Sequence, residues 1–128
     1  MEKMMALTAI MESAIQSGLK GTHYQNRILP AQSPLMVKAE EEGRLIPADI
    51  NNRMIRYVSA IMEVKSSMGV IVAAPTAGSC GAMPGAVLAI ADALGSSKVE
   101  RSRALFVAGL IGVCIAKDAT FAAEEGGG

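Results

Sequence analysis

The chain has 128 residues, and its 12 basic and 12 acidic side chains leave no net formal charge. Hydrophobic residues make up 51% and charged residues 19%, a balance that excludes a mainly disordered chain. A neutral chain also lacks the positive field that nucleic acids and anionic membranes attract, so we expect neither as a partner. The length suits one domain, and we treat residues 1–128 as a single domain.

The composition also limits the core and the compartment. Aromatic residues make up only 3%, so the core must be built from Ala, Ile, Leu, Val and the nine Met, which favours helix packing. Two cysteines cannot form a disulfide framework, and the amino terminus lacks the pattern of a secretory signal. No apolar run reaches the length of about 18 residues that a membrane-spanning helix needs. We therefore expect a reduced, cytoplasmic setting.

The first third of the chain predicts two helices joined by a polar loop. Residues 3–19 carry apolar side chains at helical spacing. Residues 20–33 are polar and rich in turn formers, which predicts a loop. Ser33 and Pro34 then form a helix start, with a hydroxyl cap and a proline in the first turn. This short helix is predicted to end at Gly43.

The strongest amphipathic pattern lies between Pro47 and Gly69, where apolar residues recur at spacings of three and four. The short β-branched segment 70–74 predicts either a strand or an extended core segment. A glycine-rich loop follows, and then two apolar helices are predicted, at 86–94 and 98–120. We expect a mainly α fold, a compact helical domain of about five helices with a glycine-rich loop before a buried helix.

The last predicted helix is apolar on nearly every side over residues 106–116, interrupted only by Gly109 and Gly112. A helix of this kind must be covered by other helices. We therefore expect it to lie in the centre of the domain. For the same reason we expect Cys114 to be a small core side chain rather than a reactive thiol.

The loop sequence PTAGSCGAMPG, residues 75–85, is the most informative segment for function. Pro84 has no backbone N–H and must lie in the first turn of a helix, which therefore begins near 81–83. Cys80 then stands just ahead of a helix N-terminus, where unpaired N–H groups and the positive dipole end favour a thiolate. The loop glycines allow a ligand to approach the backbone closely.

Three interpretations of this loop are open from the residues alone. It is a turn between a core segment and a buried helix, or it presents Cys80 as a nucleophile or metal ligand, or it binds a small anion without catalysis. A nucleophilic Cys80 predicts rapid labelling by iodoacetamide. The loop is neither a Walker A motif nor a nucleophile elbow. His23 is the only histidine, which excludes a histidine-based metal site or triad within the chain, and we expect it in a solvated loop.

Residues 69–81, GVIVAAPTAGSCG, closely resemble the alpha subunit, or catalytic domain, of iron–sulfur-dependent L-serine dehydratases. The helix at 58–68 is similar to the one that precedes this motif in that family. Residues 118–120 and 125–127 resemble the family's run toward a Gly-Gly-Cys-Gln segment. The resemblance covers most of the chain and is weakest at residues 1–35.

The resemblance implies that the complete enzyme holds a [4Fe–4S] cluster through three cysteines and converts L-serine to pyruvate and ammonia. It makes Cys80 the first cluster ligand. It puts Thr76, Gly78 and Ser79 in the loop that lines the substrate pocket. It further implies a beta subunit or regulatory domain as a partner, and a homo-oligomeric assembly.

The sequence departs from the family pattern at its end. The family's other two ligands follow the Gly-Gly pair, at the point where this sequence ends with Gly128, and Cys114 matches no ligand position. We therefore expect a chain truncated before the remaining cluster cysteines, with no cluster bound and no activity alone. The lyase interpretation depends on this one sulfur: it requires Cys80 to face a cavity, and a side chain sealed among aliphatic neighbours would contradict it.

Overall fold

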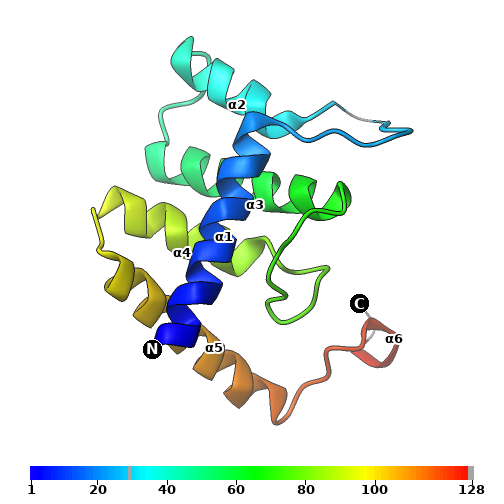
Figure 1. Cartoon of the computed structure of the whole chain (residues 1–128), viewed down its shortest axis with the longest axis vertical. Helices are drawn as coiled ribbons and strands as arrows, with labels where there is room; N and C mark the ends of the chain where they lie inside the picture. The colour runs from blue at the N-terminus through cyan, green and yellow to red at the C-terminus, as the bar shows by residue number, and fades with distance from the viewer. Residues whose placement is uncertain (29, 127–128) are drawn as a thin grey trace.

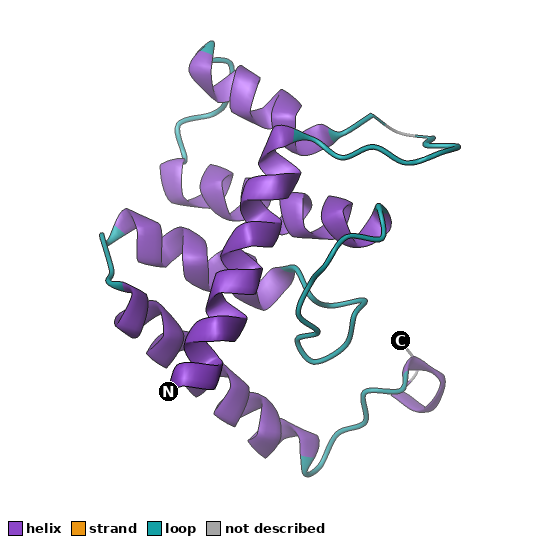
Figure 2. Ribbon diagram, in the orientation of Figure 1, coloured by secondary structure: helices purple, strands orange, loops and turns teal. Residues whose placement is uncertain are grey.

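The computed structural model describes residues 1–28 and 30–126, and every regular element in these ranges is a helix (Figure 2). The expected mainly α fold is confirmed. The helices are α1 (Glu2–Lys20), α2 (Gln32–Glu41), α3 (Asp49–Ser66), α4 (Ala82–Ala93), α5 (Lys98–Ala116) and the short α6 (Ala123–Gly126). The segment 70–74, which could have been a strand, belongs to the loop between α3 and α4.

The helices form a row with one helix laid across it. Helices α2, α3, α4 and α5 follow one another along the long axis of the molecule, and α1 crosses the row on one face (Figure 1). Each neighbouring pair in the row packs together, and α1 packs against all four members. The most extensive contacts are those of α3 with α1 and with α4, so these three helices form the centre of the fold.

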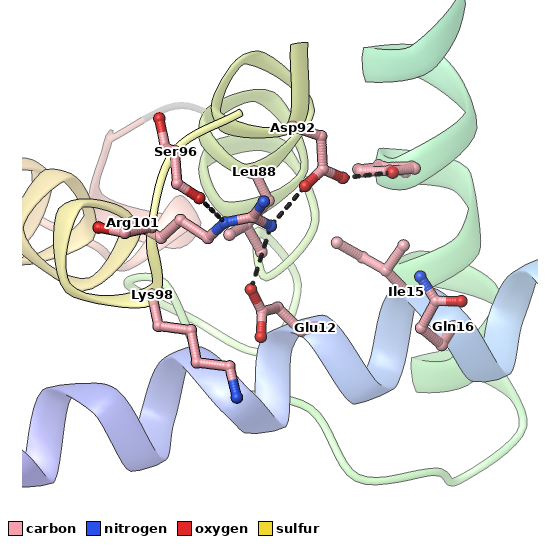
Figure 3. A pocket seen from close by; sticks show the side chains of 10 residues that line it. Glu12, Ile15, Gln16, Leu88, Asp92, Ser96, Lys98 and Arg101 are labelled. Atoms are coloured by element: carbon pink, nitrogen blue, oxygen red, sulfur yellow. Dashed lines mark hydrogen bonds and ion pairs between the residues drawn. The ribbon is translucent and has the colours of Figure 1, made fainter. Parts of the chain in front are cut away.

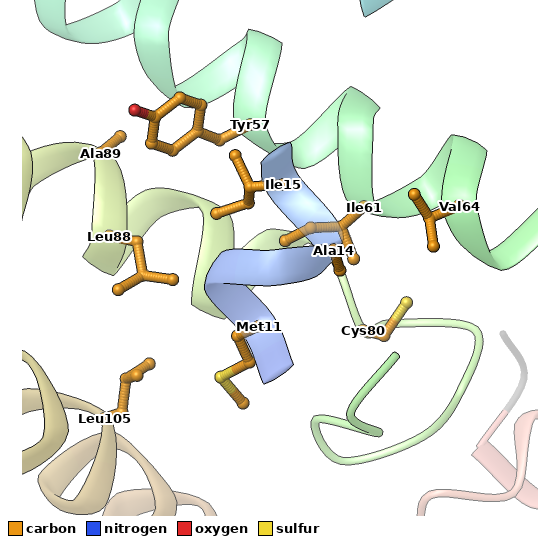
Figure 4. Close-up of a cluster of buried hydrophobic side chains, with 10 residues drawn as sticks. All are labelled: Met11, Ala14, Ile15, Tyr57, Ile61, Val64, Cys80, Leu88, Ala89 and Leu105. Atoms are coloured by element: carbon orange, nitrogen blue, oxygen red, sulfur yellow. The ribbon is translucent and has the colours of Figure 1, made fainter. Parts of the chain in front are cut away.

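The core lies where α1, α3 and α4 meet (Figure 4). Most of the apolar residues that the sequence predicted at helical spacing in α1 and α3 lie in or against this cluster, because residues three and four apart share one side of a helix. Helix α5 adds a single side chain to this cluster. The buried members are Met11, Ala14, Ile15, Tyr57, Ile61, Val64, Cys80, Leu88, Ala89 and Leu105.

Two glycines let helices touch backbone to backbone at this centre. A Cβ atom on Gly18 of α1 would overlap the carbonyl group of Ala60 in α3. A Cβ atom on Gly85 of α4 would lie 2.8 Å from the backbone nitrogen of Val58, also in α3. Glycine costs stability in a helix interior, and here the cost is offset by the close approach it permits. Helices α1 and α4 are thus both held against the main chain of α3.

The expectation that the apolar helix lies in the centre is wrong for the described part of the chain. Only Ser102 and Leu105 of α5 are buried, and both lie in its first half. The second half extends past α1 and α4 to the edge of the molecule, where Phe106 is 50% and Val113 69% exposed (Figure 1). Cys114 is exposed as well, which corrects its expected place in the core.

The helix boundaries follow local signals. Ser97 and Glu100 form a reciprocal capping box that begins α5, with the Ser97 N–H donating to the Glu100 carboxylate at 2.7 Å. The Ser97 hydroxyl also donates to the Glu100 carboxylate, and this bond, followed by that from the Ser97 N–H, holds the pKa of Glu100 below its ordinary value. Helix α5 ends at Ala116, four residues before its predicted end. Within the described ranges, none of the helices combines the length and the apolar character needed to cross a membrane.

Candidate functional site

The candidate loop joins α3 to α4 and is anchored at both ends. After α3, Met68 adopts a left-handed backbone conformation (φ 61°), and the N–H of Gly69 donates to the carbonyl of Val64 at 2.8 Å. At the other end α4 begins at Ala82, with Gly81 as its N-cap, as Pro84 predicted. Cys80 therefore stands directly ahead of a helix N-terminus.

Thr76 and Ser79 fold the loop back on itself. Their hydroxyl oxygens lie 3.0 Å apart, and the Ser79 N–H donates to the Thr76 hydroxyl at 3.2 Å. The Thr76 N–H donates to the Ser79 hydroxyl at 3.3 Å. Ser79 and Gly78 are exposed, and Thr76 is partly exposed. The three predicted substrate-binding residues therefore come together on the solvent side of one turn.

Cys80 points the opposite way, into the protein core (Figure 4). Its side chain is completely buried, and its sulfur lies 3.9 Å from the sulfur of Met62 on α3. A Cβ atom on the next residue, Gly81, would lie 2.9 Å from Met62 as well, so this end of the loop is pressed against α3. The sulfur is sealed among core side chains, contrary to the open position that iron binding requires.

The surroundings of Cys80 favour the neutral thiol. Burial raises its pKa above the ordinary value, and this effect outweighs the opposing influence of the nearby Lys65. The helix N-terminus is where the sequence predicted it, but loss of solvation is the stronger effect. In this arrangement Cys80 is not an activated nucleophile, which weighs against the interpretation of the loop as a nucleophilic site.

The described residues do not fit a three-cysteine cluster. Cys80 is buried beside α3, whereas Cys114 is exposed on α5, and both are free thiols. Among the residues that the structure describes, no group of three His, Cys, Asp or Glu side chains is placed to hold a metal ion. His23 is exposed in its loop, as expected. Gly127, part of the family resemblance, and Gly128, where the sequence departs from it, lie outside the described residues.

A second polar site, which the sequence did not reveal, lies where α1, α4 and α5 meet (Figure 3). Arg101 of α5 forms ion pairs with Asp92 of α4 and with Glu12 of α1, the latter at 3.3 Å. Its Nε donates to the Ser96 carbonyl at 2.9 Å. The Tyr57 hydroxyl of α3 donates to the other Asp92 oxygen at 2.6 Å. These groups border a cavity of about 500 Å³.

This network connects four helices. Arg101 and Asp92 each have more than one partner, so the cluster crosslinks the fold with its charges satisfied. Burial and the hydrogen bond to Asp92 raise the pKa of Tyr57 to about 12. The partners are separated by 35 and 89 residues in the sequence, which is why no local pattern indicates the site.

The raised pKa of Tyr57 predicts a pH-dependent stability. The folded state holds the phenol proton up to about pH 12, whereas the unfolded chain releases it near pH 10. The shift corresponds to about 3 kcal/mol, which solvent screening of the partly buried phenol reduces to about 2 kcal/mol; this stabilisation is complete below pH 10 and is lost as the pH rises toward 12. We expect Tyr57→Phe to lower the free energy of unfolding at pH 8 by about 1 kcal/mol.

Urea unfolding at pH 8 and pH 11 measures this effect, because the gap between the wild type and Tyr57→Phe should shrink at the higher pH. Tyr24→Phe, which changes an exposed phenol, serves as the control and should show no gap at either pH. An equal gap for Tyr57→Phe at both values would contradict the assigned hydrogen bond.

The two cysteines should differ sharply in reactivity. With iodoacetamide at neutral pH, we expect Cys114 to be labelled at the rate of a free thiol, because it is exposed. Cys80 should be labelled at least about 100-fold more slowly, since its thiol is buried and protonated. Peptide mass spectrometry over time gives both rates. Faster labelling of Cys80 than of Cys114 would support the nucleophile interpretation instead.

Comparison with known proteins points to one family. The whole sequence, residues 1–128, matches the family described as serine dehydratase alpha chain. The chain is 30% identical over 119 residues to the probable L-serine dehydratase, alpha chain, of Bacillus subtilis (strain 168), covering 93% of this chain and 40% of the relative. No solved structure matches it.

Two further relatives carry the same description. The chain is 39% identical over 79 residues to the probable L-serine dehydratase, alpha chain, of Latilactobacillus sakei, covering 62% of this chain and 38% of the relative. It is 38% identical over 85 residues to the L-serine dehydratase, alpha chain, of Peptoniphilus asaccharolyticus, covering 66% and 29%. The chain thus spans less than half the length of these relatives, and it belongs to the serine dehydratase alpha chain family.

Proposed function

We propose that this chain is part of the catalytic alpha portion of an L-serine dehydratase, which eliminates water from L-serine to give aminoacrylate; hydrolysis of this product consumes water and releases ammonia and pyruvate. The observation that carries the proposal is the family match over residues 1–128. Because the chain spans 40% or less of each relative, the activity is proposed for the complete assembly. The chain alone is proposed to be inactive.

The exposed side of the loop is the proposed substrate surface. Thr76 and Ser79 present two hydroxyl groups 3.0 Å apart. Among the described residues, a Cβ atom at Gly78 would approach only the Thr76 hydroxyl, at 3.6 Å, so the backbone there is open to a small ligand. Hydroxyls and backbone N–H groups are suitable donors for the carboxylate of an amino acid. We assign these three residues to binding the serine carboxylate.

The [4Fe–4S] cofactor is a proposal that rests on the resemblance of residues 69–81 to the iron–sulfur enzymes. Cys80 would be one ligand, and the described residues do not supply the others. Iron is bound by a thiolate rather than a thiol. Cys80 can therefore bind iron only in a loop conformation that exposes its sulfur, which is buried here. We assign no step of the reaction to the cluster.

The partners and compartment follow from the same proposal. The relatives are named alpha chains, which supports a beta subunit or an equivalent regulatory domain as the partner. We further propose a homo-oligomeric enzyme. Both cysteines are free thiols, which fits a reducing, cytoplasmic location.

The proposal is tested by completing the enzyme. The chain is produced together with the remaining part of the Bacillus subtilis alpha chain and the matching beta chain, and iron and sulfide are added without oxygen. We expect pyruvate release from L-serine by this assembly and none by the chain alone. Cys80→Ala should abolish both bound iron and pyruvate, whereas Cys114→Ala, an exposed control, should retain them.

The outcomes separate the competing interpretations. An assembly that binds iron but releases no pyruvate from L-serine would overturn the proposed activity. Full activity in Cys80→Ala would remove Cys80 from the ligand set. Binding of L-serine that is lost in Ser79→Ala, without turnover, would favour the alternative of a helical anion-binding module.

A further inference from the structure

An uncharged groove runs along the second half of α5. It has a volume of about 590 Å³ and is bordered by the start of α1, the loop segment 72–75 and residues 105–116. The side chains that line it within the described ranges are uncharged, among them Met4, Phe106 and Val113. Apolar surface of this extent on a protein marks a site of interaction.

The glycines of α5 indicate what kind of surface meets the groove. Elsewhere in this fold the interior helix glycines Gly18 and Gly85 stand at close helix crossings, where a Cβ atom would collide with the backbone of α3. Gly109 and Gly112 are also interior to a helix, yet a Cβ atom there would meet no described atom within 4 Å. Their cost in helix stability is therefore not offset within the described chain. By the same reasoning, Gly109 and Gly112 indicate a position where another helix packs closely against α5.

The relatives contain a further part of the alpha chain that this sequence does not match. We propose that a helix of that part packs against the face of α5 centred on Gly109, Gly112 and Val113. More than half of the length of the Bacillus subtilis relative lies there. The proposal rests on family membership and is independent of the serine chemistry.

The exposure of α5 favours this occupant over a second copy of the chain. Val107 lies about half a turn around the helix from Gly109, since each residue adds about 100°, and it is 53% exposed. Apolar side chains are thus exposed on opposite sides of the helix. A two-fold contact with a second copy covers one patch, whereas the remainder of an alpha chain is long enough to surround the helix.

Binding tests the proposed contact directly. The chain is mixed with the separately produced remaining part of the Bacillus subtilis alpha chain, and light scattering and titration give stoichiometry and affinity. We expect a one-to-one complex that Val113→Lys weakens at least tenfold. Ile46→Lys, which alters an equally exposed apolar side chain on the loop before α3, should leave the affinity unchanged.

The glycines supply a second, independent readout. Gly109→Ala should raise the urea midpoint of the isolated chain, because the added methyl group meets open space in a helix. The same change should weaken the complex, whereas Gly18→Ala should lower the midpoint of the isolated chain by overlap with α3.

Four results would overturn the inference. These are the absence of a complex, a complex insensitive to Val113→Lys, a homodimer that Val113→Lys dissociates, and a Gly109→Ala variant as destabilised as Gly18→Ala.

Discussion

The close contact of α1 and α4 with the backbone of α3 is the constraint on which the rest of the structure depends. Gly18 and Gly85 permit that contact, and neither position has room for a Cβ atom. The loop of residues 67–81 returns the chain from the end of α3 to the start of α4. In this loop Thr76 and Ser79 lie on the solvent side, whereas Cys80, where the loop meets α3, lies inside. The geometry of the candidate site is thus a consequence of helix packing.

The two sides of the loop differ in chemistry because they differ in solvation. On the outside, the hydroxyl and N–H groups of Thr76 and Ser79 hydrogen-bond to one another on the solvent side of the turn. On the inside, desolvation keeps Cys80 a neutral thiol beside Met62, despite the helix N-terminus next to it. The chain belongs to the serine dehydratase alpha chain family, and the cluster that we propose requires the completed enzyme to turn this buried sulfur outward.

The sequence correctly predicted features that depend on residues close together in the chain, and it missed features that depend on contacts between residues far apart in the chain. The period of α3 and the position of Pro84 in the first turn of α4 are local, and both predictions are confirmed. Apolar periodicity reports which residues avoid water but not what covers them, so α5 was wrongly placed at the centre. The Arg101 network joins residues far apart in the chain and left no local pattern. The burial of Cys80 depends on α3, which loop composition does not report.

The central claim is that α1, α3 and α4 form one close-packed unit from which the second half of α5 extends uncovered. Amide hydrogen exchange of the chain, resolved by peptide, measures this most directly. The account predicts the slowest exchange in α3 around Ala60 and exchange at least about 100-fold faster over residues 106–116. Equal protection of α3 and residues 106–116 would contradict it.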